Sequence, residues 1–159
     1  MAVYTKINKS DISLINKKFN IENFKNFKGI KQGIENTNYL LKSKNNKFIL
    51  TIFEKRVLKK EIPFFIKLMD QLSALNIICP KPLKNKNGQF LIKLKNKTAC
   101  IVSFLTGKSK KNLSLKNCYD IGKTVALIHL YTKKIKLFRT NSMGIKKLKP
   151  LLNKIKFKS

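Results

Sequence analysis

Three short strand-like segments follow one another before the first long helix pattern. They span residues 24–30, 37–41 and 47–53, and the last of them, KFILTIF, is the strongest strand signal in the chain. Gly33 and the Lys44-Asn45-Asn46 segment supply turn residues between them. Parallel strands need a crossover of about a dozen residues or more, so connections this short predict three successive antiparallel strands.

Helical patterns precede and follow these strands. Ser10 and Asp11 are typical N-cap residues and predict a short first helix. Pro63 falls in the first turn of a longer amphipathic helix, where its missing N–H costs little, and Asn76 ends that helix. Apolar residues at helical spacing support both helices: Ile12, Ile15 and Phe19 in the first, and Ile62, Phe65, Ile66, Met69 and Leu72 in the second.

Two more strands are predicted after the long helix. Asn87-Gly88 is the dipeptide preferred in type I′ hairpin turns. Residues 91–94 and 98–104 are predicted to form two strands that flank a further turn at 95–97. Thr106-Gly107 then ends the sheet.

The remaining residues predict helices with little sheet left to cover. Ser114 can cap a helix that carries Cys118, Ile121, Val125, Leu127 and Ile128, and a final amphipathic helix carries Leu148, Leu151, Leu152 and Ile155. We expect their apolar faces to need a partner that this chain does not supply. The whole order predicts an α+β fold: a helix, three strands, a helix, two strands, a connector and helices.

The chain is strongly basic. Thirty-six Lys and Arg residues face seven Asp and Glu residues, which gives a net charge of +29. Such a charge attracts nucleic acids, anionic lipids or phosphorylated ligands. Only Arg56 and Arg139 are arginines, and the lysines are spread over the whole chain, whereas base readout favours the planar arginine fork. We expect no specific nucleic-acid partner, and a lysine-rich nucleic-acid-binding protein stays as the alternative function.

Other features argue against several protein classes. Hydrophobic residues make up 43% of the chain, which is too many for a disordered protein. No apolar run approaches the ~20 residues of a membrane span, and residues 1–10 contain no signal-peptide core, so we expect a cytoplasmic protein. Cys79, Cys100 and Cys118 lie far apart, which argues against a disulfide scaffold or a zinc module and favours small buried hydrophobes.

Several local motifs together resemble one enzyme family. They are MAVYT at 1–5, FKGI at 27–30, GIENTNYLL at 33–41, FILTIFEKRV at 48–57, PFF at 63–65, CPKP at 79–82, IVSFLTG at 101–107, IGK at 121–123, IHL at 128–130, Asn141 and PLL at 150–152. The chain resembles the homoserine kinases of the aminoglycoside/choline phosphotransferase superfamily, whose fold is protein-kinase-like. The resemblance covers essentially every residue, and its specificity comes from the combination of motifs.

The resemblance implies an activity and a division of the chain. Homoserine kinases transfer the γ-phosphate of ATP to the hydroxyl of L-homoserine in threonine biosynthesis, and they use Mg²⁺. It implies a nucleotide-binding N-lobe at 1–107, followed at 108–159 by a connector and the start of an incomplete helical C-lobe. The family's catalytic loop of His-x-Asp…Asn type and its later metal-binding Asp have no match here, so we expect no catalytic or metal-binding residue in this chain. Kinases for another small alcohol, such as choline or an aminoglycoside, are the nearest alternative.

The resemblance also implies a set of nucleotide-binding residues. A loop over the ATP phosphates would contain Gly33, Asn36, Thr37 and Asn38, although a single glycine in a hairpin is more often only a turn residue. Thr51 stands where kinases usually place a lysine, and Lys55 or Arg56 would supply charge nearby or simply be solvated. A hinge at Ser103, Phe104 and Leu105 would pair with the adenine edge through its backbone.

Glu61 has two possible roles, and His129 is expected to have a structural one. Glu61 would orient a cation, or it would complement the dipole at the start of its helix. His129 is the only histidine, and its position on the apolar side of a predicted helix favours a packed core residue with no catalytic role.

Overall fold

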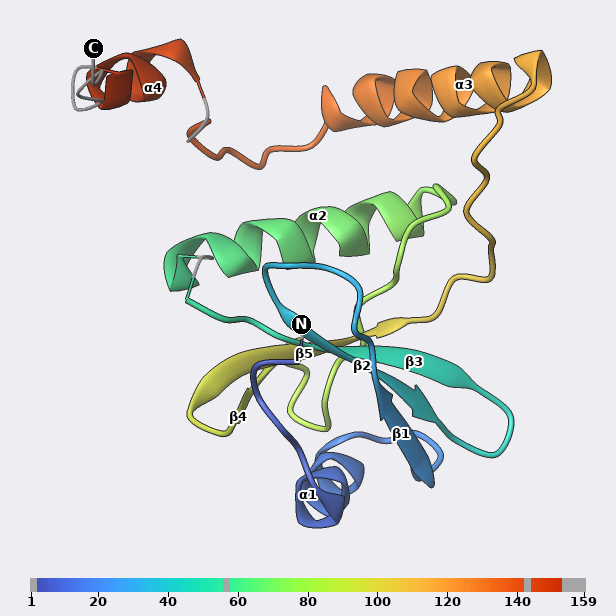
Figure 1. Ribbon diagram of the computed structural model, residues 1–159, viewed down its shortest axis with the longest axis vertical. Coiled ribbons are helices and arrows are strands. Elements are labelled where there is room, and N and C mark those ends of the chain that lie inside the picture. The colour runs from blue at the N-terminus through green and yellow to red at the C-terminus, as the bar shows by residue number, and fades with distance from the viewer. Residues whose placement is uncertain (1–2, 56–57, 142–143, 153–159) are drawn as a thin grey trace, which may run out of the picture.

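The computed structural model of this chain describes residues 3–55, 58–141 and 144–152 (Figure 1). Its elements are α1 (Lys9–Lys18), β1 (Asn26–Gly29), β2 (Thr37–Lys42), β3 (Lys47–Ile52), a 3₁₀ turn (Lys59–Glu61), α2 (Ile62–Ala74), β4 (Leu91–Leu94), β5 (Lys97–Ser103), α3 (Leu115–Thr132) and α4 (Ile145–Leu152). The strands form one antiparallel five-stranded sheet in the order β1-β2-β3-β5-β4. The predicted α+β fold is confirmed.

The two faces of the sheet are covered by different helices. Figure 1 shows the sheet between α1 on one side and α2 on the other. β5 contributes to both cores because successive side chains of a strand point to opposite faces. Ala99 and Ile101 belong to the buried cluster that contains the α1 side chains, and Cys100 and Val102 belong to the cluster that contains the α2 side chains. All four are at most 7% exposed.

The turn of the β4–β5 hairpin lies within the predicted residues 95–97, but the type I′ geometry predicted for Asn87-Gly88 is found here instead. Lys95 and Asn96 both have positive φ, 49° and 60°, as a type I′ turn requires. At Asn87-Gly88 only Gly88 has positive φ, and its N–H donates to the Asn85 carbonyl. A type I′ turn at Asn87-Gly88 was therefore wrong. The strand register determines which residues form the two-residue hairpin turn, because the pairing of Leu94 with Lys97 leaves only Lys95 and Asn96 between the strands.

The cap of α1 lies upstream of the predicted one. Asn8 is the N-cap, and its Oδ1 accepts a hydrogen bond of 3.0 Å from the Asp11 N–H. The Asp11 carboxylate in turn accepts from the Asn8 N–H at 2.9 Å, which completes a capping box. Ser10 and Asp11 therefore lie inside the helix, and the prediction that they cap it was wrong.

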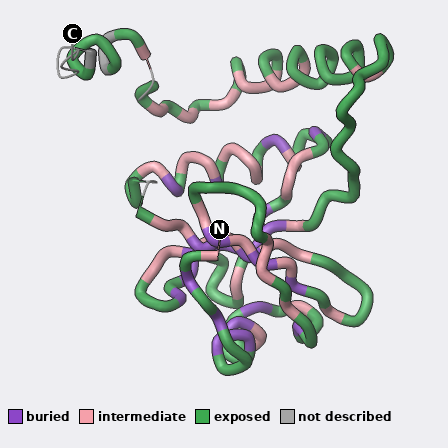
Figure 2. The backbone as a smooth tube through the Cα atoms, viewed as in Figure 1, coloured by how far each residue is buried: buried purple, intermediate pink, exposed green. Residues whose placement is uncertain are grey.

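The last two helices have no buried face among the described residues. Ser114 caps α3 as predicted, with its Oγ accepting from the Asn117 N–H at 3.3 Å. No described side chain of α3 is buried, and Figure 2 shows the helix as exposed and intermediate throughout. The predictions that His129 and Cys118 are buried were therefore wrong, because the helix that carries them has no partner here; Cys79 is only half-buried. The predicted contribution of Ile155 lies outside the described residues.

Candidate functional site

A cleft of about 580 Å³ lies between the sheet and α2. Its wall is mostly apolar and comes from β3, α2 and β5, and polar side chains enter it from the β1–β2 loop, β2 and the end of β5. The lining residues include Ile49, Phe65, Met69, Cys100 and Val102 on the apolar side and Glu35, Asn36, Asn38, Thr51 and Ser103 on the polar side. An apolar cavity with a few convergent polar groups is the usual form of a small-molecule site.

A hydrogen-bonded pair forms part of the cleft surface. Asn38 and Thr51 are directly opposite in the β2–β3 register, so both side chains emerge on the α2 face. The Thr51 hydroxyl donates to Asn38 Oδ1 at 2.8 Å. Since this oxygen is engaged, the Asn38 amide presents its two N–H donors for other contacts, and no described residue accepts from them. The pair can therefore donate to an anionic or carbonyl-like group of a ligand.

The end of β5 forms another part of the cleft surface. The Ser103 N–H donates to the Lys81 carbonyl and the Phe104 N–H to the Lys47 carbonyl, at 2.9 and 3.3 Å. The next N–H, that of Leu105, has no hydrogen-bond partner among the described residues. All three predicted hinge residues, Ser103, Phe104 and Leu105, line the cleft. A backbone donor that borders an apolar cleft can pair with the polar edge of a flat heterocycle.

Cys100 keeps the cleft wall apolar. Its side chain is 2% exposed. Burial raises the pKa of the Cys100 thiol to about 12, so the sulfur is protonated at neutral pH. The residue is therefore a small neutral wall group and not a nucleophile.

The loop between β1 and β2 contains Gly33 in a conformation that favours glycine. Gly33 has φ +102°, and apart from its chain neighbours no described residue has an atom within 4 Å of the place that a Cβ would take. The glycine itself does not line the cleft, whereas Asn36 of the same loop does. The Tyr4 hydroxyl donates to the Ile34 carbonyl at 3.0 Å and holds the loop from outside.

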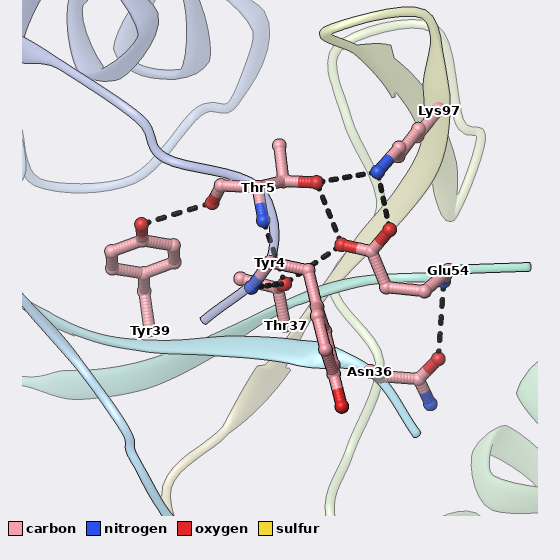
Figure 3. A network of polar contacts seen from close by, with 7 residues as sticks. All are labelled: Tyr4, Thr5, Asn36, Thr37, Tyr39, Glu54 and Lys97. Atoms are coloured by element: carbon pink, nitrogen blue, oxygen red, sulfur yellow. Dashed lines mark hydrogen bonds and ion pairs between the residues drawn. The ribbon is translucent and has the colours of Figure 1, made fainter. Parts of the chain in front are cut away.

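The Thr37 side chain lies on the face of the sheet away from the cleft. The side chain is fully buried on the α1 face, opposite to the face on which its neighbours Asn36 and Asn38 line the cleft. Its hydroxyl donates to the Glu54 carboxylate at 2.7 Å and accepts from the Tyr4 and Thr5 N–H groups (Figure 3). The Thr37 side chain therefore does not face the cleft, and the predicted place of Thr37 in the phosphate loop stays a prediction that concerns its backbone. The alternation Thr37, Tyr39, Leu41 on one face of a strand is a signal that could have indicated this.

Glu61 forms an ion pair away from the cleft. Its Oε2 accepts from Nε and Nη2 of Arg139 at 3.2 and 2.9 Å. The Arg139 guanidinium also lies 5.0 Å from the ring centroid of Phe65, a residue of α2 that does line the cleft. Glu61 therefore ties α2 to the segment after α3, and neither charged group of this pair lines the cleft.

The cations near the end of β3 are only partly described. Lys55 is exposed and lines a smaller hollow beside Glu54 and Tyr4, whereas Arg56 lies outside the described residues.

Among the residues that the structure describes, no group of three or more His, Cys, Asp or Glu side chains could hold a metal ion. Over the same residues, no helix combines the length and the apolar character that a bilayer crossing needs.

Sequence interpretation missed one polar cluster entirely. Glu54, Lys97 and Thr5 converge with Thr37 on the α1 side of the sheet (Figure 3). Lys97 and Glu54 are 43 residues apart in the chain, and Thr5 and Glu54 are 49 apart. No local spacing indicates such a contact.

Comparison with known proteins gives a consistent result. A model of the "Phosphotransferase enzyme family" matches residues 26–154. The homoserine kinase of Paramagnetospirillum magneticum is 36% identical over 156 residues, which are 98% of this chain and 48% of that protein. The homoserine kinase of Agrobacterium fabrum is 36% identical over 154 residues, 97% of this chain and 48% of that protein. The chain thus spans about half the length of the curated relatives it matches.

Solved structures agree with the fold. A spectinomycin phosphotransferase in complex with ADP and spectinomycin has a TM-score of 0.65 at 14% identity, covering 98% of this chain and 49% of that one. A microcompartment-associated aminopropanol kinase has a TM-score of 0.64 at 12% identity, covering 88% and 47%. These likenesses establish the kinase-like fold. With the family match over most of its residues, this chain belongs to the phosphotransferase enzyme family.

Proposed function

We propose that this chain forms the nucleotide-binding part of a kinase that phosphorylates the hydroxyl of L-homoserine. The observation that carries the proposal is the cleft under α2, which combines an apolar wall with the Asn38–Thr51 pair and the Leu105 N–H, a donor that no described residue engages. ATP needs such a combination, because its adenine ring is flat and largely apolar and its phosphates need hydrogen-bond donors. Homoserine as acceptor is supported by the 36% identity to homoserine kinases.

Within this proposal each part of the cleft has a role. The Leu105 N–H pairs with the adenine edge, and Ile49, Cys100 and Val102 contact the ring. Asn36, Asn38 and Thr51 face the phosphates, with Lys55 supplying charge from the end of β3. Residues 1–107 then form the nucleotide-binding lobe, and residues 108–159 form the connector and the first helices of a second lobe.

The chemistry requires groups that the described residues do not provide. In the transfer, the homoserine hydroxyl oxygen forms a bond to the γ-phosphorus, the bond from that phosphorus to the β-phosphate oxygen breaks, and the hydroxyl proton passes to a base. Mg²⁺, when bound, offsets phosphate charge. The described residues contain no acidic cluster that fits a metal ion. This chain spans about half the length of the homoserine kinases it matches, and we expect the base and the metal ligands in the other half of such a kinase, in a His-x-Asp…Asn loop and a later Asp.

The test is a comparison of acceptors. The protein expressed from the uninterrupted reading frame that carries these residues would be assayed with ATP, Mg²⁺ and homoserine, choline or an aminoglycoside. We expect the highest kcat/KM with homoserine, and no transfer by residues 1–159 alone. A preference for choline or an aminoglycoside would refute homoserine as the acceptor. Transfer by residues 1–159 alone would refute the proposal that the base and the metal ligands lie elsewhere.

We expect the activity in the cytoplasm, where ATP and the amino acid are both available.

A further inference from the structure

We infer that Glu54 is a positioning residue for the phosphate end of the cleft, although its carboxylate lies on the opposite face of the sheet. The inference rests on the proposed nucleotide binding. Glu54 follows β3, and its side chain is 10% exposed. Its carboxylate joins three parts of the chain that are distant in sequence: the N-terminal segment, the start of β2 and the start of β5 (Figure 3).

The contacts of the carboxylate form a complete set of donors. Oε1 accepts from the Thr5 and Thr37 hydroxyls, at 2.6 and 2.7 Å, and Oε2 accepts from the Lys97 ammonium. Lys97 also donates to the Thr5 hydroxyl oxygen at 2.7 Å. Every hydrogen-bond partner of the Glu54 carboxylate among the described residues is therefore a donor, which favours the ionised carboxylate.

The acidity of Glu54 agrees with this geometry. Burial by itself raises the pKa of the carboxyl. The hydrogen bonds from Lys97, Thr5 and Thr37, with the charge of Lys97, outweigh burial and hold the pKa below its usual value. The carboxylate is charged at neutral pH, and its donors stay oriented.

The cluster reaches the cleft through the backbone of β2. Thr37, which Glu54 holds, lies between Asn36 and Asn38, and both asparagines line the cleft on the other face. The Glu54 N–H also donates directly to Asn36 Oδ1 at 3.3 Å. Glu54 thus fixes the position of the start of β2 and the orientation of the Asn36 side chain at the polar part of the site.

The same cluster anchors the loop that contains Gly33. The Thr37 hydroxyl accepts from the Tyr4 and Thr5 N–H groups at 2.9 and 3.1 Å. The Tyr4 hydroxyl then donates to the Ile34 carbonyl in that loop. Removing the charge of Glu54 would therefore release the N-terminal segment and, with it, the external support of the loop.

The test compares a nucleotide with a nucleoside. Isothermal titration would measure the Kd of ADP and of adenosine for residues 1–159 and for the variants Glu54→Gln, Thr37→Val and Thr37→Ser. We expect Glu54→Gln and Thr37→Val to weaken ADP binding by about tenfold, as loss of a charge-assisted hydrogen bond does, and to leave adenosine within about twofold. Thr37→Ser keeps the hydroxyl and should bind ADP like the parent.

The weaker ADP binding expected for Glu54→Gln is the opposite of what the net charge of the chain alone would predict. Glu54→Gln removes a negative charge from a chain of net charge +29, so long-range attraction alone would tighten ADP binding. Glu22→Gln is the matched control, because Glu22 also accepts three hydrogen bonds, from Ser43 and Asn45, at the far end of the β2–β3 hairpin. This variant should bind ADP like the parent.

Each outcome decides one claim. Parent-like ADP binding by Glu54→Gln would overturn the inference, as would equal losses for ADP and adenosine, which indicate a general loss of structure. If Glu54→Gln does not fold, the pair Thr37→Val and Thr37→Ser decides, and equal ADP affinities of these two would overturn the inference. A parent chain that binds neither ligand would instead refute the proposed nucleotide binding, and this inference with it.

Discussion

Replacement of Thr51 by valine tests the polar pair of the cleft. Valine keeps the shape and the β-branch of threonine but removes the hydroxyl that donates to Asn38 Oδ1 at 2.8 Å. A neutral hydrogen bond is worth about 0.5–1.5 kcal/mol, which corresponds to a roughly two- to thirteenfold change in Kd. We expect ADP binding to weaken within that range, because the Asn38 amide loses the contact that orients its N–H donors toward the ligand.

The assay is a double-mutant cycle on the Kd of ADP. It uses Thr51→Val, Asn38→Ala and the double variant, with Thr98→Val as the control. Thr98 lies on β5, and its hydroxyl has no hydrogen-bond partner among the described residues, so its loss should leave ADP binding unchanged. We expect the double variant to lose about 1 kcal/mol less than the sum of the single variants. Strict additivity would show that the two residues act independently and would refute the pair as a unit.

Three further predictions concern the loop, acid stability and the net charge. Gly33→Val forces a β-branched residue toward φ +102°, a left-handed strain of about 1–2 kcal/mol. In the proposed kinase, steady-state kinetics should therefore give a higher ATP KM with a smaller change in the homoserine KM, and an unchanged ATP KM would contradict this. Because the folded-state pKa of Glu54 is depressed, its stabilisation is full above the ordinary value of 4.5 and is lost as the pH falls through the folded pKa. Urea titrations should therefore give a smaller difference in the free energy of unfolding between the parent and Glu54→Gln at pH 3.5 than at pH 7. Lys97, Lys55 and Glu35, which share the hollow beside Glu54, stay unchanged in both proteins. An equal difference at both pH values would refute the stabilising role of the Glu54 carboxylate. If the lysines carry no specific nucleic-acid function, binding of the chain to DNA should not depend on sequence and should be lost steeply with salt, whereas a sequence-specific complex that survives high salt would favour the alternative function.

Much of the sheet could be predicted because its information is local. Short connections determine that β1, β2 and β3 pair as antiparallel neighbours, and the apolar stripe of α2 determines which side of the helix is buried. The position of the turn between β4 and β5 was predicted at 95–97, but its type I′ geometry could not be assigned from its residues. Lys95 and Asn96 adopt positive φ because the register of the two strands requires it, although Asn87-Gly88 has the stronger sequence preference.

The candidate site was predictable to the extent that it follows the backbone. Asn38, Thr51 and the hinge residues converge because β2, β3 and β5 are paired neighbours. The contacts of Glu54 were not predictable, since they join segments that only the folded topology brings together. The loop motif did not indicate that the Thr37 side chain is buried, but the alternation of the strand turns this side chain to the face opposite to that of its neighbours.

The most direct test of the central claim is a map of the ADP contacts in solution. Amide ¹H–¹⁵N shifts of the 18.4 kDa chain would be followed during a titration with ADP at moderate salt. If the cleft under α2 binds nucleotide, saturable shifts should concentrate at Leu105, Asn36, Asn38 and Thr51, and the Leu105 amide should respond to adenosine as well. Shifts that do not saturate, or that are scattered over the exposed lysines and spare these four amides, would contradict the nucleotide-binding role of this chain.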